Sequence, residues 1–170
     1  MRAVLIVNPS ATSTTPAGRD LLAHALESRV TLNVVHTDHR GHAIEIAQEA
    51  TRGGVDVLIV HGGDGTVNEV VNGILGEQRP GNTGPAVGVV PGGSANVFAR
   101  ALGISPDPTE ATNQLVDLLG DYRRRKTWRR IGLMDCGDRW GVFTAGMGVD
   151  GDVVAAVEAQ RAKGRKVTAS

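Results

Sequence analysis

Short runs of apolar residues alternate with amphipathic stretches along most of the chain. The runs are rich in valine, isoleucine and leucine and contain few polar residues, which is typical of strands buried on both faces of a parallel sheet. The stretches between them carry apolar residues at helical spacing. This alternation predicts an α/β fold with an open, mostly parallel sheet flanked by helices. We expect strands at residues 3–7, 31–35, 55–60 and 86–90, and helices at residues 17–28, 42–52, 66–75, 95–101 and 109–119.

The pattern changes at a basic run, residues 123–126. The two strands and the helix expected after it lie at residues 127–135, 140–145 and 150–162. The strands are interpreted as a meander that turns at Gly137-Asp138. A tail of about 45 residues is small for an independent core. We therefore predict a first domain at residues 1–122 and the incomplete start of a second, β-rich domain at residues 123–170.

Charge and aromatic content exclude one class of partner. The 170 residues carry 18 lysine and arginine against 18 aspartate and glutamate side chains, with two Trp, two Phe and one Tyr. Such a chain offers neither the basic field nor the stacking surfaces that are typical of nucleic-acid binding. No apolar run approaches the roughly 20 residues of a membrane-spanning helix. We expect a cytoplasmic protein whose membrane contact is peripheral, at the inner membrane face.

The spacing of the cysteine and histidine residues in the sequence does not indicate a metal centre. Cys136 is the only cysteine, so no disulfide can form within the chain, which fits a reducing compartment. His36, His39 and His61 lack the spacing of a metal site. His42 is interpreted as a residue that starts a helix.

Glycine content is unusual, because 23 glycines are about 14% of the chain and roughly twice the ordinary share. The strongest cluster, Gly62-Gly63-Asp64-Gly65-Thr66-Val67-Asn68-Glu69, stands between a predicted buried strand and a helix. Glycines at the carboxyl end of a parallel strand let backbone N–H groups converge on an anion, and the helix N-terminus adds partial positive charge. Because Asp64 alone would repel a phosphate, its presence favours a divalent cation, Mg²⁺, between the carboxylate and the phosphates.

Three other predicted strand ends carry small or polar residues. Pro91-Gly92-Gly93-Ser94-Ala95-Asn96 repeats the order of strand, glycines and helix, with Ser94 at the expected N-cap. Asn8-Pro9-Ser10 follows the first strand, and Thr37 with Gly41-His42-Ala43 follows the second. Since the carboxyl ends of parallel strands meet at one edge of a sheet, we expect these segments to share one cleft.

These segments resemble the catalytic domain of diacylglycerol kinases, which is shared with sphingosine kinases and bacterial soluble lipid kinases and, more distantly, with NAD kinase and phosphofructokinase. The resemblance rests on residues 8–10, 37, 41–43, 62–73 and 91–100, and residues 146–150 resemble the family's entry into its second domain. The block at residues 62–73 is the most specific. The distant relatives share its Gly-Gly-Asp-Gly-Thr but not Asn68-Glu69 or the trailing Asn72-Gly73.

The resemblance implies ATP-dependent phosphorylation of a lipid hydroxyl, with Mg²⁺ as cofactor and ATP as co-substrate. It implies that Asp64 organises Mg²⁺ through water, and Asp64 is the catalytic residue that we assign. The residues that it implies at the ATP site are Asn8, Thr37, Gly62, Gly63, Asp64, Gly65, Thr66, Asn68, Glu69, Gly93 and Ser94. The family usually has threonine in place of Ser94, so a hydroxyl is retained. The expected partners are ATP and a diacylglycerol-like lipid at a membrane surface, without nucleic acid, and a homodimer stays open.

The family's second domain supplies lipid contacts and an acidic residue that activates the acceptor hydroxyl, whereas this sequence ends at Ser170. We therefore expect a truncated form that binds ATP weakly and lacks efficient kinase turnover, and robust lipid phosphorylation would contradict this. Two alternatives stay open, namely a kinase with a soluble acceptor such as NAD and a non-catalytic nucleotide-binding module. The basic run with Trp128, Arg129 and Arg130 either meets anionic lipid headgroups or forms a solvated hinge.

Overall fold

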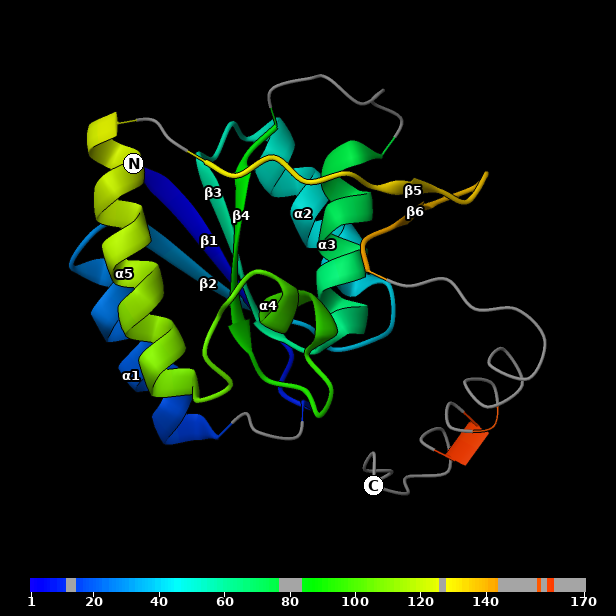
Figure 1. The fold of residues 1–170 in the computed structure, drawn as a ribbon, viewed down its shortest axis with the longest axis horizontal. Helices are drawn as coiled ribbons and strands as arrows, with labels where there is room; N and C mark the ends of the chain where they lie inside the picture. The colour runs from blue at the N-terminus through cyan, green and yellow to red at the C-terminus, as the bar shows by residue number, and fades with distance from the viewer. Residues whose placement is uncertain (12–14, 77–83, 126–127, 144–155, 157–158, 161–170) are drawn as a thin grey trace.

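A four-stranded parallel sheet with the order β2-β1-β3-β4 forms the centre of the fold (Figure 1). The computed structural model describes residues 1–11, 15–76, 84–125 and 128–143, together with 156, 159 and 160. The strands of the sheet are β1 (Arg2–Val7), β2 (Thr31–His36), β3 (Val57–Gly62) and β4 (Ala86–Pro91). The helices are α1 (Pro16–Glu27), α2 (His42–Arg52), α3 (Asp64–Leu75), α4 (Val97–Ala101) and α5 (Pro108–Arg125).

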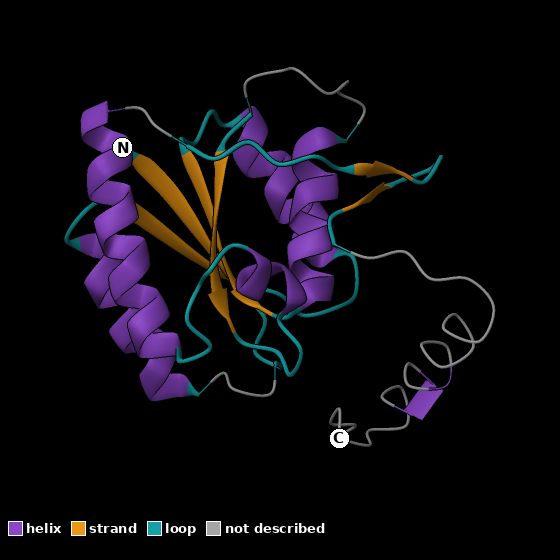
Figure 2. Ribbon diagram, viewed as in Figure 1, coloured by secondary structure: helices purple, strands orange, loops and turns teal. Residues whose placement is uncertain are grey.

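Helices cover both faces of the sheet (Figure 2). Side chains of α1 and α5 pack on one face with Leu5 and Ile59, and side chains of α2 and α3 pack on the other face with Ile6 and Val60. All six residues of β3 are buried, as its apolar sequence predicts for a central strand. The expected α/β class, with an open parallel sheet flanked by helices, is therefore confirmed.

The direction of the chain changes between β1 and β3. From β1 the chain crosses through α1 to β2 on one side, and from β2 it crosses back through α2 to β3 on the other side of β1. The two crossover helices lie on opposite faces of the sheet (Figure 1). In open α/β sheets such a switch point leaves a crevice at the carboxyl ends of the strands, where ligands bind.

Helices α2 and α3 approach each other closely at Gly73. A Cβ atom at this position would lie 2.5 Å from the backbone oxygen of Ile44 and 2.7 Å from the Cβ of Ala47. Real Cβ atoms do not approach other atoms this closely, so the contact requires glycine. The Gly73 of the Asn72-Gly73 pair is thus explained by packing of two helices.

A short antiparallel hairpin, β5 (Met134–Asp135) and β6 (Trp140–Gly141), lies beside α3 (Figure 1). Asn72 of α3 holds it, because its Nδ2 donates to the backbone oxygen of Trp140 at 2.9 Å and its Oδ1 accepts from the backbone nitrogen of Trp140 at 2.8 Å. The hairpin confirms the expected meander and its turn, although both strands are shorter than expected. The expected helix at residues 150–162 lies largely outside the described residues.

Several boundaries differ from the sequence prediction. Strand β3 begins and ends two residues later than expected, because it pairs with β4 as far as Gly62 and Pro91. Helix α5 continues through Gly120 to Arg125, so the residues that we interpreted as a boundary are helical. Their arginines occupy the last turn, where positive charge interacts favourably with the helix dipole. The division of the chain at residue 123 stays a prediction. Within the described ranges, the helices fall short of the length and apolar character needed to cross a bilayer.

Candidate functional site

The carboxyl ends of all four parallel strands meet at one edge of the sheet, which we call the rim. Thr37 follows β2, Asn8 follows β1, Gly63 follows β3, and Gly92 follows β4, in that spatial order. These are the strand ends that the sequence singles out. The structure therefore brings the four predicted segments to one edge, as expected from a parallel sheet.

Asn8 bridges the switch point between β1 and β3. Its backbone nitrogen donates to the oxygen of His61 at 3.0 Å, and its side-chain Nδ2 donates to Oγ1 of Thr66 at 3.1 Å. Its Oδ1 accepts from the backbone nitrogen of Ser10 at 2.9 Å, which forms the turn after β1. Thr66 is buried and packs over Gly62, where a Cβ would lie 3.0 Å from the threonine side chain. Asn8, Gly62 and Thr66 thus form one connected unit.

The two glycine loops contact each other through their backbones. A Cβ at Gly93 would lie 2.6 Å from the Cα of Gly63, and a Cβ at Gly63 would lie 3.3 Å from the Cα of Gly93. The backbone nitrogen of Gly92 also donates to the oxygen of Gly62 at 2.9 Å. Sequence reasoning assigned these glycines to a ligand, whereas the structure shows that Gly63 and Gly93 are also needed for contact between the loops.

Asp64 joins the two loops through hydrogen bonds that sequence reasoning missed. Its Oδ2 accepts from the backbone nitrogen of Val97 and its Oδ1 from that of Phe98, both at 3.0 Å. Asp64 lies in the first turn of α3 but caps the N-terminus of α4, whose own N-cap residue Asn96 makes no side-chain capping bond. A cap supplied by a residue 33 positions earlier leaves no local sequence signal.

The second loop is shaped by Asn96, which has a left-handed backbone with φ of 47°. Its Oδ1 accepts from the nitrogen of Gly93 at 2.9 Å, and its Nδ2 donates to the oxygen of Gly93 at 2.6 Å. The expectation that Ser94 is the N-cap is wrong, because α4 begins three residues later and Asn96 is the N-cap. Ser94 is exposed, and among the described residues its hydroxyl has no hydrogen-bond partner.

The remaining predicted residues lie toward β2. Glu69 of α3 accepts through Oε1 from the backbone nitrogen of Gly41 at 3.1 Å, which ties the loop after β2 to α3. Thr37 is buried, and its backbone nitrogen donates to the oxygen of Val7 at 2.9 Å. The backbone oxygen of Asn68 accepts from Nδ2 of Asn72 at 2.8 Å, one turn further along α3. Glu69 therefore links the loop after β2 to helix α3 in this structure.

The start of α3 offers unpaired N–H groups beside open space. The first hydrogen bond of the helix runs from Val67 to the oxygen of Gly63 at 3.1 Å, so the N–H groups of residues 64–66 precede the intrahelical ladder. Gly65 is exposed, and a Cβ there would meet no atom within 4 Å. Unlike Gly63, Gly65 is not required by packing. This part of the rim can accept an anion, because unpaired N–H groups and the helix dipole both favour negative charge.

The family model of the diacylglycerol kinase catalytic domain matches residues 2–124, which include β1 to β4 and all but the last residue of α5. The chain belongs to the diacylglycerol kinase catalytic domain family. A "Probable lipid kinase YegS-like" of Chromohalobacter salexigens is 41% identical over 96 residues, 56% of this chain and 30% of that protein. "Lipid kinase YegS" of Escherichia coli (strain K12) is 38% identical over 101 residues, 59% of this chain and 33% of that protein.

Solved structures agree with the family. A diacylglycerol kinase from Bacillus anthracis str. Sterne superposes with a TM-score of 0.62 at 33% identity, covering 69% of this chain and 42% of the other. The chain spans about a third of the length of the curated relatives that it matches. The family match and the solved structure therefore agree on the fold of this chain.

A cavity of about 140 Å³ lies between α1 and α5 in this family member. It reaches the rim only at His61 and Val90, and its other lining comes from α1 and α5, including Leu22 and Thr112. Ligand pockets typically measure about 300–1,000 Å³. The cavity is too small for a nucleotide and lies away from the glycine loops, so we do not assign it to the functional site.

His61 is a buried ionisable residue at the rim. Burial lowers its pKa below the ordinary value of about 6.5, and the nearby positive charge of Arg19 lowers it further, against an opposing hydrogen bond with Val90. Its Nδ1 lies 3.3 Å from the oxygen of Val90. Because a carbonyl oxygen only accepts, Nδ1 carries the hydrogen. We infer that His61 is neutral near pH 7.

We predict that His61 makes the protein less stable in mild acid. The unfolded chain binds this proton more readily than the folded chain, so the contribution is fully present above about pH 6.5 and falls as the pH drops toward the lowered folded pKa. Urea unfolding at several pH values between about 7.5 and 5 should therefore give a smaller loss of stability for His61→Gln than for the wild type. Equal losses in the two proteins would contradict this assignment.

Proposed function

We propose that this chain carries the nucleotide-binding part of an ATP-dependent lipid kinase, which transfers the γ-phosphate of ATP to a hydroxyl group of a diacylglycerol-like lipid. The observation that carries the proposal is the pair of glycine loops, after β3 and β4, packed backbone against backbone beside the switch point. Such a pair presents N–H groups without bulky side chains, as phosphate sites do. The family and the names of its relatives support the lipid acceptor.

The start of α3 is the part of the rim that we assign to the phosphates. Gly65 leaves room for a phosphate oxygen, and Asn8 holds Thr66 in the turn that presents the unpaired N–H groups. The exposed hydroxyl of Ser94 lies on the opposing loop. Phosphoryl transfer needs positioning and charge stabilisation more than covalent chemistry from the protein. A rim built mainly of backbone amides meets the first of these needs.

Mg²⁺ is the cofactor that the family implies, and Asp64 fits it through water. Two backbone hydrogen bonds fix the carboxylate, and each oxygen, with one bond used, keeps a lone pair for a bound water. This agrees with the preference of Mg²⁺ to retain several waters. When bound, the ion would neutralise charge on the phosphates. Asp64 would thus orient the water shell and hold the two loops together.

Binding of MgATP to the chain tests the nucleotide site. Gly65→Glu places a carboxylate in the open space and should lower the affinity for MgATP by about tenfold or more, because two like charges a few ångströms apart repel by more than about 1.4 kcal/mol. The fold should tolerate it, since nothing lies within 4 Å and acidic residues suit a first helical turn. Gly120→Glu, at an equally open position on α5, is the control that should bind normally. Calorimetric titration that shows equal affinities would contradict the site.

Transfer of radiolabel from ATP tests the acceptor. The chain is incubated with γ-labelled ATP and either vesicles that contain diacylglycerol or NAD. Label in the lipid and not in NAD supports the proposal, and label in NAD assigns a soluble acceptor instead. If ATP binds but neither acceptor is labelled, the chain by itself is a nucleotide-binding module, as expected for a part that lacks efficient turnover, and the lipid acceptor gains no support.

A further inference from the structure

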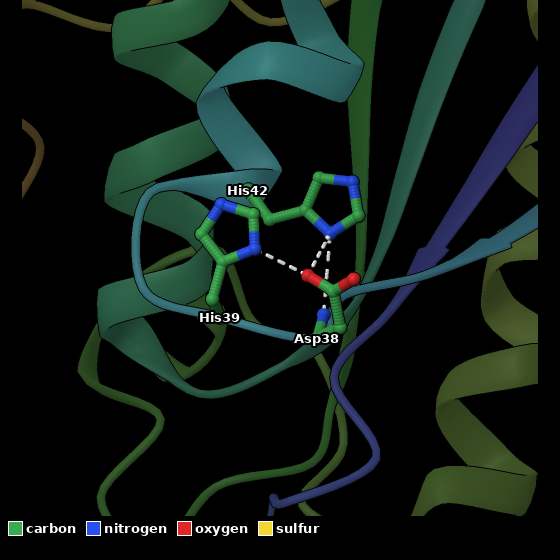
Figure 3. A group of neighbouring side chains, drawn as sticks. All are labelled: Asp38, His39 and His42. Atoms are coloured by element: carbon green, nitrogen blue, oxygen red, sulfur yellow. Dashed lines mark hydrogen bonds and ion pairs between the residues drawn. The ribbon is translucent and has the colours of Figure 1, made fainter.

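Three side chains that can bind a metal converge after β2. Asp38 and His39 lie in the loop, and His42 is the first residue of α2 (Figure 3). One ligand atom from each residue lies within 4.8 Å of the other two. His39, whose spacing in the sequence does not indicate a metal site, thus lies beside two other side chains of ligand type. The turn at Gly41, with φ of 88°, folds the loop back and brings His39 and His42 together.

The two histidine rings are stacked, with centroids 4.7 Å apart and planes 7° from parallel. Figure 3 shows an Nδ1 atom of each ring directed at the same carboxylate. Oδ1 of Asp38 contacts Nδ1 of His39 closely and lies 2.7 Å from Nδ1 of His42. Two ring nitrogens thus face one carboxylate oxygen, and the three atoms lie within reach of a single ion.

Two contacts of Nδ1 of His42 make conflicting demands on this atom. The backbone nitrogen of Asp38 donates to it at 3.2 Å, which requires a lone pair on Nδ1. Oδ1 of Asp38 lies close to the same atom, and two lone pairs at this distance repel. A positive charge between Oδ1 and the ring nitrogens removes the repulsion. The charge is either a proton or a metal ion.

A proton can supply this charge, and the charges favour it on His39. The hydrogen bond to Asp38 is the main cause that raises the pKa of His39, and the same bond is the main cause that lowers the pKa of Asp38. A proton on His39 leaves Nδ1 of His42 free to accept from the backbone N–H of Asp38, but it also leaves Oδ1 of Asp38 beside that lone pair. A cation bound to all three atoms would replace the 3.2 Å bond from the Asp38 N–H and would bind both rings and the carboxylate at once.

The donor set selects a class of ion. Two imidazoles and one carboxylate are the ligands of open zinc sites, whereas Mg²⁺ prefers oxygen ligands. Oε1 of Glu45 lies 3.6 Å from Nε2 of His39, which places a carboxylate behind a ligating ring, as is usual around zinc. With bonds of about 2.0–2.1 Å, ligand atoms at a tetrahedral zinc lie about 3.3 Å apart. The side chain of Asp38 is 74% exposed, so it can move away from the rings until its oxygen lies about 3.3 Å from each ring nitrogen.

We propose that Asp38, His39 and His42 bind one divalent transition-metal ion of the zinc class beside the nucleotide rim. The site is distinct from the Mg²⁺ position assigned to Asp64, which lies on α3. The loop is already tied to α3 by Glu69 and to β1 by Thr37, so the ion would stiffen the β2 end of the rim.

Titration of the metal-free chain with Zn²⁺ alone tests the site. We expect saturable binding of one ion per chain by calorimetry, and Co²⁺ at the same site should give the absorption bands of tetrahedral coordination. Asp38→Asn and His42→Ala should each weaken Zn²⁺ binding by about tenfold or more, while circular dichroism reports that the fold is intact. His36→Ala removes an exposed histidine two positions before Asp38 and should leave the affinity unchanged within about twofold.

Several outcomes would overturn the metal site. These are no saturable binding of Zn²⁺, equal weakening by His36→Ala, and unchanged affinity in Asp38→Asn and His42→Ala. The test does not depend on ATP, so it can fail or succeed separately from the nucleotide site. If the wild type binds no Zn²⁺ and NMR shows both rings titrating with Asp38, a proton occupies the cluster and the proposal is wrong.

Discussion

Gly73→Ala is expected to lower the free energy of unfolding by about 1–3 kcal/mol, the usual cost of forcing an extra group into a packed contact. The added Cβ would lie 2.5 Å from a backbone oxygen of Ile44, which cannot rotate away, so α2 and α3 must move apart. The movement also strains Asn72, which holds the hairpin. Urea unfolding followed by circular dichroism measures the change.

Gly120→Ala is the control for this substitution. Gly120 also lies within a helix, but a Cβ there meets nothing within 4 Å. Alanine should therefore stabilise the protein by about 0.5–1 kcal/mol, because it loses less backbone freedom on folding. If the two variants change stability in the same direction, the tight contact between α2 and α3 is not the reason for Gly73.

Asp64→Ala is expected to have two effects, of which only one concerns catalysis. Loss of both backbone hydrogen bonds to α4 should lower the free energy of unfolding by about 2 kcal/mol, the size of a strong helix cap. It also loosens the second glycine loop and removes the carboxylate that we assign to the Mg²⁺ waters. We expect ATP binding to weaken and its enhancement by Mg²⁺ to disappear.

Asp107→Ala separates the two effects. Oδ1 of Asp107 accepts from the backbone nitrogens of Thr109 and Glu110, both at 2.9 Å, at the start of α5. The variant thus also loses two backbone hydrogen bonds at a helix start. It should lose comparable stability and keep the enhancement of ATP binding by Mg²⁺. If Asp64→Ala keeps that enhancement as well, Asp64 has a structural role only, and loss of activity would not identify it as catalytic.

Much of the fold could be predicted because the sheet is parallel and its central strands β1 and β3 are buried. Helix α2 has the predicted bounds, since glycines at positions 41 and 53 flank it. Helix α3 begins two residues earlier than predicted, because Asp64 and Gly65 resemble loop residues in the sequence but take helical conformations beneath the second loop. Helix α4 is shorter than predicted, because its N-terminus depends on a distant carboxylate.

The rim was predictable as a set of strand ends, and its internal bonds were not. Nothing local in the sequence indicates that Asn8 meets Thr66 or that Glu69 accepts from Gly41, because these pairs are 58 and 28 positions apart. The cluster of Asp38, His39 and His42 could not be predicted for a different reason. Its residues are close in sequence, but rules of spacing for zinc ligands describe other loops, and only the turn at Gly41 brings these rings together.

The contact between Gly63 and Gly93 has a consequence for protein engineering. Residues 62–66 transplanted alone into another sheet would lose half of their packing contact, because the opposing surface comes from a loop 30 positions later. The recipient must receive the loop after β4 as well, with Asn96 to shape it. Glycine loops of this kind are therefore portable only as a pair of adjacent strands with both loops.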